Sequence, residues 1–485
     1  MVPLSALPGT RGLPPATLSL LRLDARAAKP LQQQLLEQLR GAILDQSLRP
    51  RQQLPSSRAL AAQLGVSRNT VLAVFDQLIS EGYLQGSRGS GTYISAELPE
   101  TFMRPVGRSV PVAPVRAAAV PPPSLVPRPF RPCMPSVAEF PLETWERLRR
   151  RVLNRKGSRL LMYCSPAGDE QLREQIALYL RDHRGVRCDP AQVIVTAGAQ
   201  QAFGLIGRAM ARRGQAIWFE DPGYIEARLA FENSGLVIVP QAVDSEGLTV
   251  PTWTTGAPQL VYTTPSRQFP LGHTMSLARR MAWLRFAAEH QAWIVEDDYD
   301  SEFRYEGRPL PSLQGLLPEA RVIYVGTFSK ALFPSLRMGY VVAPIERLRA
   351  FWEAKETADL HAPAIDQAVV AAFMREGHFV RHLRAMRTLY AERAEVFAEA
   401  ARKEWRGLVT LDSIGAGLNV AGWVDEDRVE RLSEAARARG YEAIPVSRYA
   451  VTAKVRPGFF FGFGAYPPAL IRRSAHELGR FWRSA

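Results

Sequence analysis

One lysine in the second half of the chain stands where a charged side chain is costly. Lys330 follows the apolar run 322–325 in the sequence VGTFSKALF, so most of its neighbours are small or apolar. Burying an ammonium group in such surroundings carries a desolvation penalty. A desolvated amine is also a nucleophile that can condense with an aldehyde to form a Schiff base. We therefore predict Schiff-base chemistry at Lys330.

Two other apolar runs end in polar groups of a complementary kind. After residues 193–195 the sequence TAGAQ, which contains Ala199 and Gln200, predicts a small-residue turn that opens a helix and offers N–H groups to an anion. Another run ends in the acidic stretch EDDYD, which contains Asp297 and Tyr299. Each feature alone has an ordinary explanation: a plain turn, solvated acids or an exposed lysine. Together they provide the phosphate cradle, the acid and the amine that pyridoxal phosphate requires.

The elements that hold these residues alternate between short apolar strands and longer helical patterns. Strands are expected at 193–195, 217–219, 237–239, 260–262, 293–295 and 322–325. Near-continuous apolar strands separated by helices are typical of an α/β domain whose mostly parallel sheet is buried on both faces. Ligands of such sheets bind beyond the carboxyl ends of the strands, where the polar groups are found.

A smaller module near the N-terminus has the pattern of a helix-turn-helix. Pro30 opens a first helix, and a second helix covers residues 58–64. Gly65 provides the turn, and Ser67 is placed to cap a third helix.

The third helix and the segment after it indicate a nucleic-acid partner. Arg68, Asn69 and Thr70 fall on the first exposed turn, where a recognition helix presents side chains to base edges. Strands at 83–85 and 92–94 flank a glycine-rich segment and predict a hairpin wing. A helical bundle with a hairpin can also bind protein, so the pattern alone leaves a protein-interaction module open.

A proline-rich segment separates the two modules. Residues 99–135 contain 11 prolines among 37 residues, which favours an extended, semi-rigid spacer. We predict a winged helix-turn-helix domain at 28–95, a linker at 96–135 and a large α/β domain at 136–485. The net charge is +14, and residues 1–130 contribute 14 basic against 7 acidic side chains. Such an excess fits a polyanionic partner, although an ordinary solvated surface would also explain it.

Several classes of protein and site are not expected. No apolar run reaches the ~18 residues of a membrane helix, and prolines interrupt the N-terminal region, so we expect a cytoplasmic protein without a membrane partner. The three cysteines have the spacing neither of a disulfide framework nor of a zinc knuckle. His378 and His382 lack the glutamate and third ligand of a metalloprotease, so no metal site is predicted.

The N-terminal module resembles a known family of bacterial regulators. The run LPSSRALAAQLGVSRNTVLAVFDQLISEGYLQGSRGSGTYI is similar to the GntR family of winged helix-turn-helix proteins along its whole length. The resemblance implies binding to double-stranded promoter DNA and disfavours the protein-interaction alternative. The residues that it places at the DNA are Arg58, Ser67, Arg68, Thr70, Arg88 and Gly89.

The large domain resembles a second family. Residues from about 140 to 480 are similar to fold-type I, class I/II aminotransferases, and VGTFSKALFPSLRMGY resembles their cofactor-lysine motif. The resemblance implies that Lys330 carries pyridoxal 5'-phosphate. It implies phosphate contacts from Thr327, Arg337, Ala199 and Gln200, with Asp297 at the pyridine nitrogen, Tyr299 at the phenolic oxygen and Tyr224 stacked on the ring.

The order of the parts resembles the MocR subfamily of GntR regulators, of which EDDYDSEFRY looks typical. This resemblance implies a homodimer that responds to a small amino-compound effector or to the cofactor itself. The subfamily more often has histidine at the position of Arg267, which we expect near the phenolic side of the ring. Arg448 aligns with an arginine that binds an effector carboxylate in the family; the alternative is a surface arginine.

Two functions use the same chemistry. One is a transcription regulator, and the other is an active aminotransferase with a DNA-binding appendage. Lys330 and Asp297 serve both functions, so they do not discriminate. The winged module favours the regulator, because a metabolic transaminase does not need one. We therefore expect, at most, residual amine exchange or half-transamination.

Overall fold

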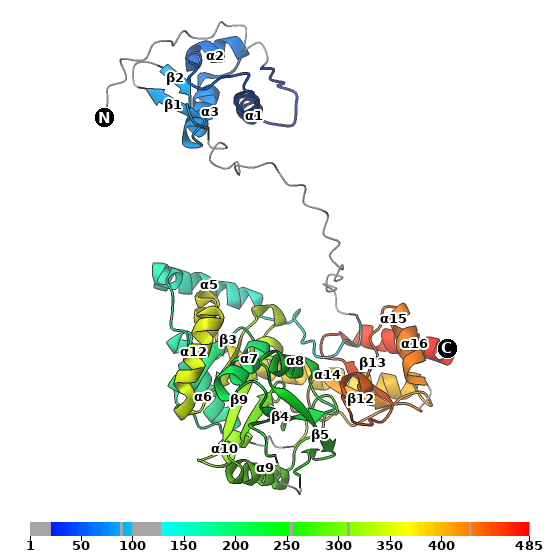
Figure 1. Cartoon of the computed structure of the whole chain (residues 1–485). Helices are drawn as coiled ribbons and strands as arrows, with labels where there is room; N and C mark the ends of the chain where they lie inside the picture. Colours follow the sequence, from blue (N-terminus) through cyan, green and yellow to red (C-terminus); the bar gives the residue numbers. More distant parts are fainter. Residues whose placement is uncertain are drawn as a thin grey trace. The chain divides into compact units, whose positions relative to one another are not determined.

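A computed structural model describes residues 21–87, 91–98, 128–251, 256–307, 311–425 and 428–484. The chain divides into two compact units, residues 1–121 and 122–485, each with a hydrophobic core of its own. Figure 1 colours the chain from blue at the N-terminus to red at the C-terminus.

The N-terminal unit is a three-helix bundle with an antiparallel hairpin. Its elements are α1 (Leu31–Leu44), α2 (Ser57–Leu64), α3 (Arg68–Ser80), β1 (Leu84–Ser87) and β2 (Gly91–Ile94). The helices pack through apolar side chains three and four residues apart, among them the fully buried Leu39, Val71 and Leu78. The predicted helix-turn-helix with its hairpin is confirmed. The predicted DNA contacts Arg88 and Gly89 lie outside the described residues.

The turn between α2 and α3 follows from two residues. Gly65 has φ +66°, a left-handed conformation that glycine adopts without strain. The Oγ of Ser67 accepts a hydrogen bond of 3.1 Å from the N–H of Thr70 and thereby caps α3. As a result α3 begins at Arg68, with Arg68 and Asn69 exposed.

The core of this unit also includes residues outside 28–95. Leu21 is buried in it, and Leu23 and Leu98 pack against it. We propose that the folded unit comprises residues 21–98.

The large unit is built on an eight-stranded sheet with the order β3-β10-β9-β8-β7-β4-β5-β6. The strands are β3 (Val193–Thr196), β4 (Ala216–Asp221), β5 (Val237–Asp244), β6 (Gly247–Leu248), β7 (Leu260–Thr263), β8 (Trp293–Asp298), β9 (Val322–Thr327) and β10 (Gly339–Val342). From β9 to β5 all neighbours are parallel, whereas β10 is antiparallel to both β3 and β9. The mostly parallel sheet is confirmed, and the carboxyl ends of β3, β4, β7, β8 and β9 lie at one edge.

Helices cover both faces of this sheet. Val193 and Val195 belong to a core shared with α5 (Leu142–Lys156), α6 (Glu170–Arg184) and α13 (Ala364–Arg375). The intervening Ile194 belongs to a core shared with α7 (Ala199–Met210), α8 (Ile225–Asn233) and α12 (Leu348–Asp359). Alternate residues of a strand point to opposite faces, so continuous apolar runs require cover on both sides.

The large unit contains three further helices near this sheet: α9 (Leu277–Glu289), α10 (Leu313–Leu316) and α11 (Phe328–Ala331). Among the residues that the structure describes, no helix is both long and apolar enough to span a bilayer.

The C-terminal part of the large unit forms a second, smaller layer. Its four-stranded sheet has the order β11-β12-β14-β13, and α14, α15 and α16 pack beside it. The elements are α14 (His378–Glu404), β11 (Thr410–Leu411), β12 (Asn419–Trp423), α15 (Val429–Ala438), β13 (Ile444–Pro445), β14 (Gly458–Gly462) and α16 (Pro468–Ser484). Figure 1 shows this layer in orange and red.

Residues 128–135 are packed into this layer. Phe130 is fully buried, with its ring centroid 5.4 Å from that of Phe397 and 5.6 Å from that of Trp405. The N–H of Gly462 donates to the carbonyl of Phe130 over 2.9 Å. We propose that the linker ends near residue 127 and not at 135, because an aromatic anchor follows the prolines.

Candidate cofactor site and DNA-contacting surface

A cavity of about 180 Å³ lies at the carboxyl edge of the large sheet. All eight residues predicted for the cofactor line it: Ala199, Gln200, Tyr224, Asp297, Tyr299, Thr327, Lys330 and Arg337. They come from four separate segments of the chain, at 199–200, 224, 297–299 and 327–337. The topology brings them together because parallel strands end at the same edge.

One end of the cavity is suited to a phosphate. Gly198, with φ +96°, turns the chain from β3 into α7, whose first two residues, Ala199 and Gln200, line the cavity. The N–H groups at the start of a helix favour an anion. The Nη2 of Arg337 donates to the carbonyl of Ala197 over 3.3 Å and would lie 3.4 Å from a Cβ at position 198. Thr327 lines the same cavity from the end of β9. The close approach of the backbone, the helix start and the guanidinium fit a phosphate dianion.

Asp297 provides a buried acid at the end of β8. Its Oδ2 accepts a hydrogen bond of 2.7 Å from the hydroxyl of Tyr262. Burial, helped by the nearby charges of Asp298 and Asp300, raises the pKa of Asp297 to about 7, although the hydrogen bond from Tyr262 lowers it in part. Within the described residues no basic side chain forms an ion pair with Asp297. A protonated pyridine nitrogen would supply the missing positive charge, so this residue also fits pyridoxal phosphate.

Lys330 lies on the short helix α11, directly after β9. Thr327 caps this helix, its Oγ1 accepting from the N–H of Ser329 over 3.1 Å. The Nζ of Lys330 donates to the carbonyl of Cys133 over 2.5 Å. The amine is half-buried in the cavity wall, where an aldehyde can reach it.

Two tyrosines line the cavity from other elements. Tyr224 precedes α8, and its ring centroid lies 5.2 Å from that of Phe269. Tyr299 follows β8, and burial raises the pKa of its phenol well above the ordinary range. Both phenols are therefore neutral hydrogen-bond donors at physiological pH. Their specific roles at the ring stay predictions.

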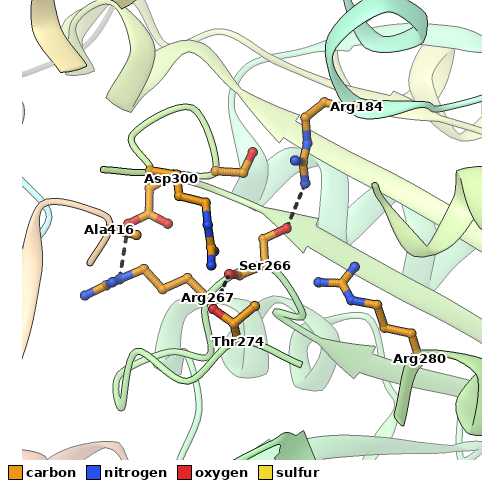
Figure 2. A pocket seen from close by; sticks show the side chains of 9 residues that line it. Arg184, Ser266, Arg267, Thr274, Arg280, Asp300 and Ala416 are labelled. Atoms are coloured by element: carbon orange, nitrogen blue, oxygen red, sulfur yellow. Dashed lines mark hydrogen bonds and ion pairs between the residues drawn. The ribbon is translucent and has the colours of Figure 1, made fainter. Parts of the chain in front are cut away.

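Arg267 does not line this cavity, and its place near the phenolic side of the ring stays a prediction. It lines a separate pocket of about 20 Å³ with Arg184 and Arg280, shown in Figure 2. Its Nε lies 3.6 Å from the Oδ2 of Asp300. Thr264 and Phe269, from the same loop after β7, line the cofactor cavity.

Arg448 also lies outside the cavity lining. It is exposed on the short turn Val446–Tyr449, and its neighbour Tyr449 packs on Phe269 with ring centroids 5.2 Å apart. Binding of an effector carboxylate by Arg448 stays a prediction.

Sequence reasoning missed five residues of the cavity: Cys133, Thr264, Phe269, Ser329 and Pro334. Two of these residues could have been predicted from the sequence: Thr264 closely follows the predicted strand 260–262, and Ser329 directly precedes Lys330. Cys133 carried no such signal, since it lies within the proline-rich segment. Among the described residues, no cluster of three His, Cys, Asp or Glu side chains is arranged to bind a metal.

The predicted DNA contacts on the N-terminal unit divide into two kinds. Arg58, Arg68 and Asn69 are exposed on α2 and α3. Ser67 and Thr70 are engaged with each other, their hydroxyl oxygens 2.8 Å apart. The structure therefore presents three exposed polar side chains, of which Arg68 donates to the Oγ of Ser57 over 3.4 Å, and it assigns Ser67 to capping.

Comparison with known proteins identifies both units. The model of class I and II aminotransferases matches residues 136–458, and that of the bacterial gntR regulatory proteins matches residues 31–94. The probable rhizopine catabolism regulatory protein MocR of Rhizobium meliloti is 39% identical over 468 residues, which cover 95% of each chain. The chain belongs to the MocR-type regulators of the GntR family.

Other matches of this MocR-type chain agree with that assignment. The pyridoxine biosynthesis transcriptional regulator PdxR of Corynebacterium glutamicum is 32% identical over 92% of this chain and 94% of its own. The crystal structure of the α-aminoadipate aminotransferase LysN of Thermus thermophilus is 28% identical, covers 73% of this chain and 92% of its own, and has a TM-score of 0.68. That structure holds N-(5'-phosphopyridoxyl)-L-leucine. The large unit thus has the fold-type I architecture, whose cofactor is pyridoxal phosphate.

Proposed function

We propose that this chain is a DNA-binding transcription regulator that senses an amino compound, or pyridoxal phosphate itself, at Lys330. The observation that carries the proposal is the presence in one chain of an exposed recognition helix and a complete cofactor cavity. The regulator relatives share this architecture over nearly their whole length. Since promoter DNA is the partner, we place the protein in the cytoplasm.

The residues of the cavity take distinct roles in this proposal. Bound pyridoxal phosphate supplies an aldehyde that exchanges amines reversibly. Thr327, Arg337 and the start of α7 hold the phosphate, and Asp297 keeps the pyridine nitrogen protonated. Lys330 would hold the cofactor through its amine, and an amino effector would compete with this amine for the aldehyde, so the lysine side chain would have to move when the effector binds.

The test replaces Lys330. We expect Lys330→Ala to lose the near-visible absorbance of the lysine-bound cofactor and the response to effector, while operator affinity stays within about tenfold, or 1.4 kcal/mol. The N-terminal unit has its own core, which is why DNA binding should persist. A Lys330→Ala protein that still responds to the effector would refute the assignment of Lys330 as the residue that holds the cofactor.

The recognition helix is tested separately. Arg68→Ala should cost about 1–3 kcal/mol of operator binding if its guanidinium contacts a base edge. The matched control is Arg26→Ala, an exposed arginine outside α2 and α3. Equal losses in the two variants would contradict a specific role for Arg68.

An active aminotransferase with a DNA-binding appendage is the competing function, because the cavity serves both. Steady-state transfer between an amino donor and a keto acid at rates above about 1 per second would favour it. Turnover far below that rate, together with effector-dependent operator binding, supports the regulator.

We also propose that the chain acts as a homodimer. Leu161, Met162 and Tyr163 form a contiguous apolar segment after α5, exposed by 74%, 68% and 84%. Such a segment favours a protein partner, and a second copy of this chain would suit paired half-sites on a promoter. Leu161→Glu with Met162→Glu should shift the mass in light scattering toward the monomer. An unchanged dimer would place the interface elsewhere.

A further inference from the structure

A series of buried and partly buried hydrogen bonds connects Arg267 to Lys330, although Arg267 does not line the cofactor cavity. The Nζ of Lys330 donates to the carbonyl of Cys133 over 2.5 Å. The N–H of Cys133 donates to the Oδ1 of Asn419 over 2.5 Å. The backbone carbonyl of Asn419 in turn accepts from the Nη2 of Arg267. The four residues form one continuous series of contacts.

Cys133 has a backbone conformation that its neighbours must maintain. Its φ is +64°, in the left-handed region that residues other than glycine seldom adopt. Both of its backbone polar groups are engaged, the N–H with Asn419 and the carbonyl with Lys330. The direction of the carbonyl that meets Lys330 therefore depends on where Asn419 holds the N–H.

Asn419 is held by strand pairing with Gly462 of β14, and its carbonyl also accepts a hydrogen bond from Arg267. Asn419 is buried at the start of β12, in the C-terminal layer, whereas Arg267 comes from the loop after β7 in the large sheet. Figure 2 shows Arg267 reaching from this loop to Asp300 and past Ala416. A Cβ at position 417 would lie 2.5 Å from the Nε of Arg267, so a glycine there makes room for the guanidinium. Arg267 thus joins the two layers beside Cys133.

We propose that Arg267 is a positioning residue for Lys330. By holding Asn419, it orients the carbonyl of Cys133, and this carbonyl directs the Lys330 amine within the cavity. The inference rests on the proposed function, because it concerns the same lysine. In this role Arg267 acts through Asn419 and Cys133 and not by contact with the cofactor ring.

The experiment compares two cofactor forms on cofactor-free, full-length protein. Pyridoxal phosphate must be captured by Lys330, whereas pyridoxamine phosphate has the same phosphate and ring but no aldehyde. We expect Arg267→Gln to slow the appearance of near-visible absorbance by about tenfold to 100-fold, as misplacement of a reacting group does. The affinity for pyridoxamine phosphate should change by less than about twofold, which is well under 1 kcal/mol. Arg267→Lys keeps a cationic donor and should recover most of the rate.

The matched control is Arg280→Gln. Arg280 lines the same small pocket and is fully buried, but it donates to the carbonyls of Met275, Pro265 and Pro311 and not to Asn419. It should leave the capture rate within about twofold of the wild type. Equal slowing by Arg280→Gln and Arg267→Gln would show general loosening of the pocket and overturn the proposal.

A second pair of variants tests the hydrogen bond between Asn419 and Cys133 without changing Arg267. Asn419→Asp retains an oxygen that accepts from the N–H of Cys133, and Asn419→Ala removes it. We expect near-normal capture in the first and slow capture in the second; equal rates would overturn the proposal. If the wild type captures no pyridoxal phosphate, the proposed function fails. If the wild type captures it and Arg267→Gln matches the wild-type rate, only the positioning role of Arg267 fails.

Discussion

Replacing Asp297 with asparagine should stabilise the cofactor-free protein while impairing its cofactor site. The carboxylate is 3% exposed, and within the described residues it has no cationic partner. Asparagine has nearly the same shape and keeps an oxygen that can accept from the hydroxyl of Tyr262. The substitution therefore removes a buried negative charge without opening a cavity.

The magnitude follows from the pKa of Asp297. Burial raises this pKa from an ordinary value of 3.8 to about 7. The folded protein therefore holds a proton that the unfolded chain releases, so folding stability falls as the pH rises from about 4 to about 7. The complete penalty is about 4 kcal/mol above pH 7 and roughly 2 kcal/mol at pH 5. Asp297→Asn should gain about these amounts in the free energy of unfolding.

Urea unfolding at pH 5 and pH 8, followed by tryptophan fluorescence, measures this gain. All nine tryptophans lie between Trp145 and Trp482, so the signal reports the large unit alone. The control is Asp244→Asn, because Arg279 lowers the pKa of Asp244 and its neutralisation should destabilise the protein at pH 8. A gain for Asp297→Asn that does not grow with pH would refute the reasoning.

The same variant should bind the cofactor less well. Asparagine cannot balance the charge of a protonated pyridine nitrogen, so we expect the affinity for pyridoxal phosphate to fall by at least about tenfold. Opposite effects on stability and on cofactor affinity in one variant would distinguish a site carboxylate from a structural one.

Three further outcomes are expected. Ser67→Ala removes the hydroxyl that accepts from the N–H of Thr70 and caps α3, so the free energy of unfolding of the N-terminal unit should fall by about 1 kcal/mol. Calorimetry should show its melting temperature lowered by about 4–8 °C. Arg184→Met leaves Asp298 buried without its 2.8 Å ion pair and should destabilise the large unit by about 3–5 kcal/mol in urea unfolding; a loss below about 1 kcal/mol would show that water replaces the pair. Shortening residues 105–127 should change the half-site spacing tolerated in DNA mobility assays but not the cofactor absorbance, since a spacer sets reach and not chemistry.

The local elements and the main site residues could be predicted from the sequence alone. The cap at Ser67 and the turn at Gly65 depend on neighbours within a few residues, which is why the recognition helix was placed correctly. Lys330 and Asp297 could be brought together in advance because parallel strands converge at their carboxyl ends, whatever the packing around them. These features rest on short-range chemistry and one general rule of topology.

Other contacts were decided only by the tertiary structure. The partners of Arg267 could not be read from the sequence: packing of the loop after β7 brings its guanidinium to Asp300 and to the carbonyl of Asn419. Phe130 was hidden in a proline-rich segment, yet it is buried in the C-terminal core. The carbonyl of Cys133 meets Lys330 across a separation of 197 residues. No local pattern encodes such pairs, because they exist only when two layers with separate cores pack against each other and bury the polar groups between them.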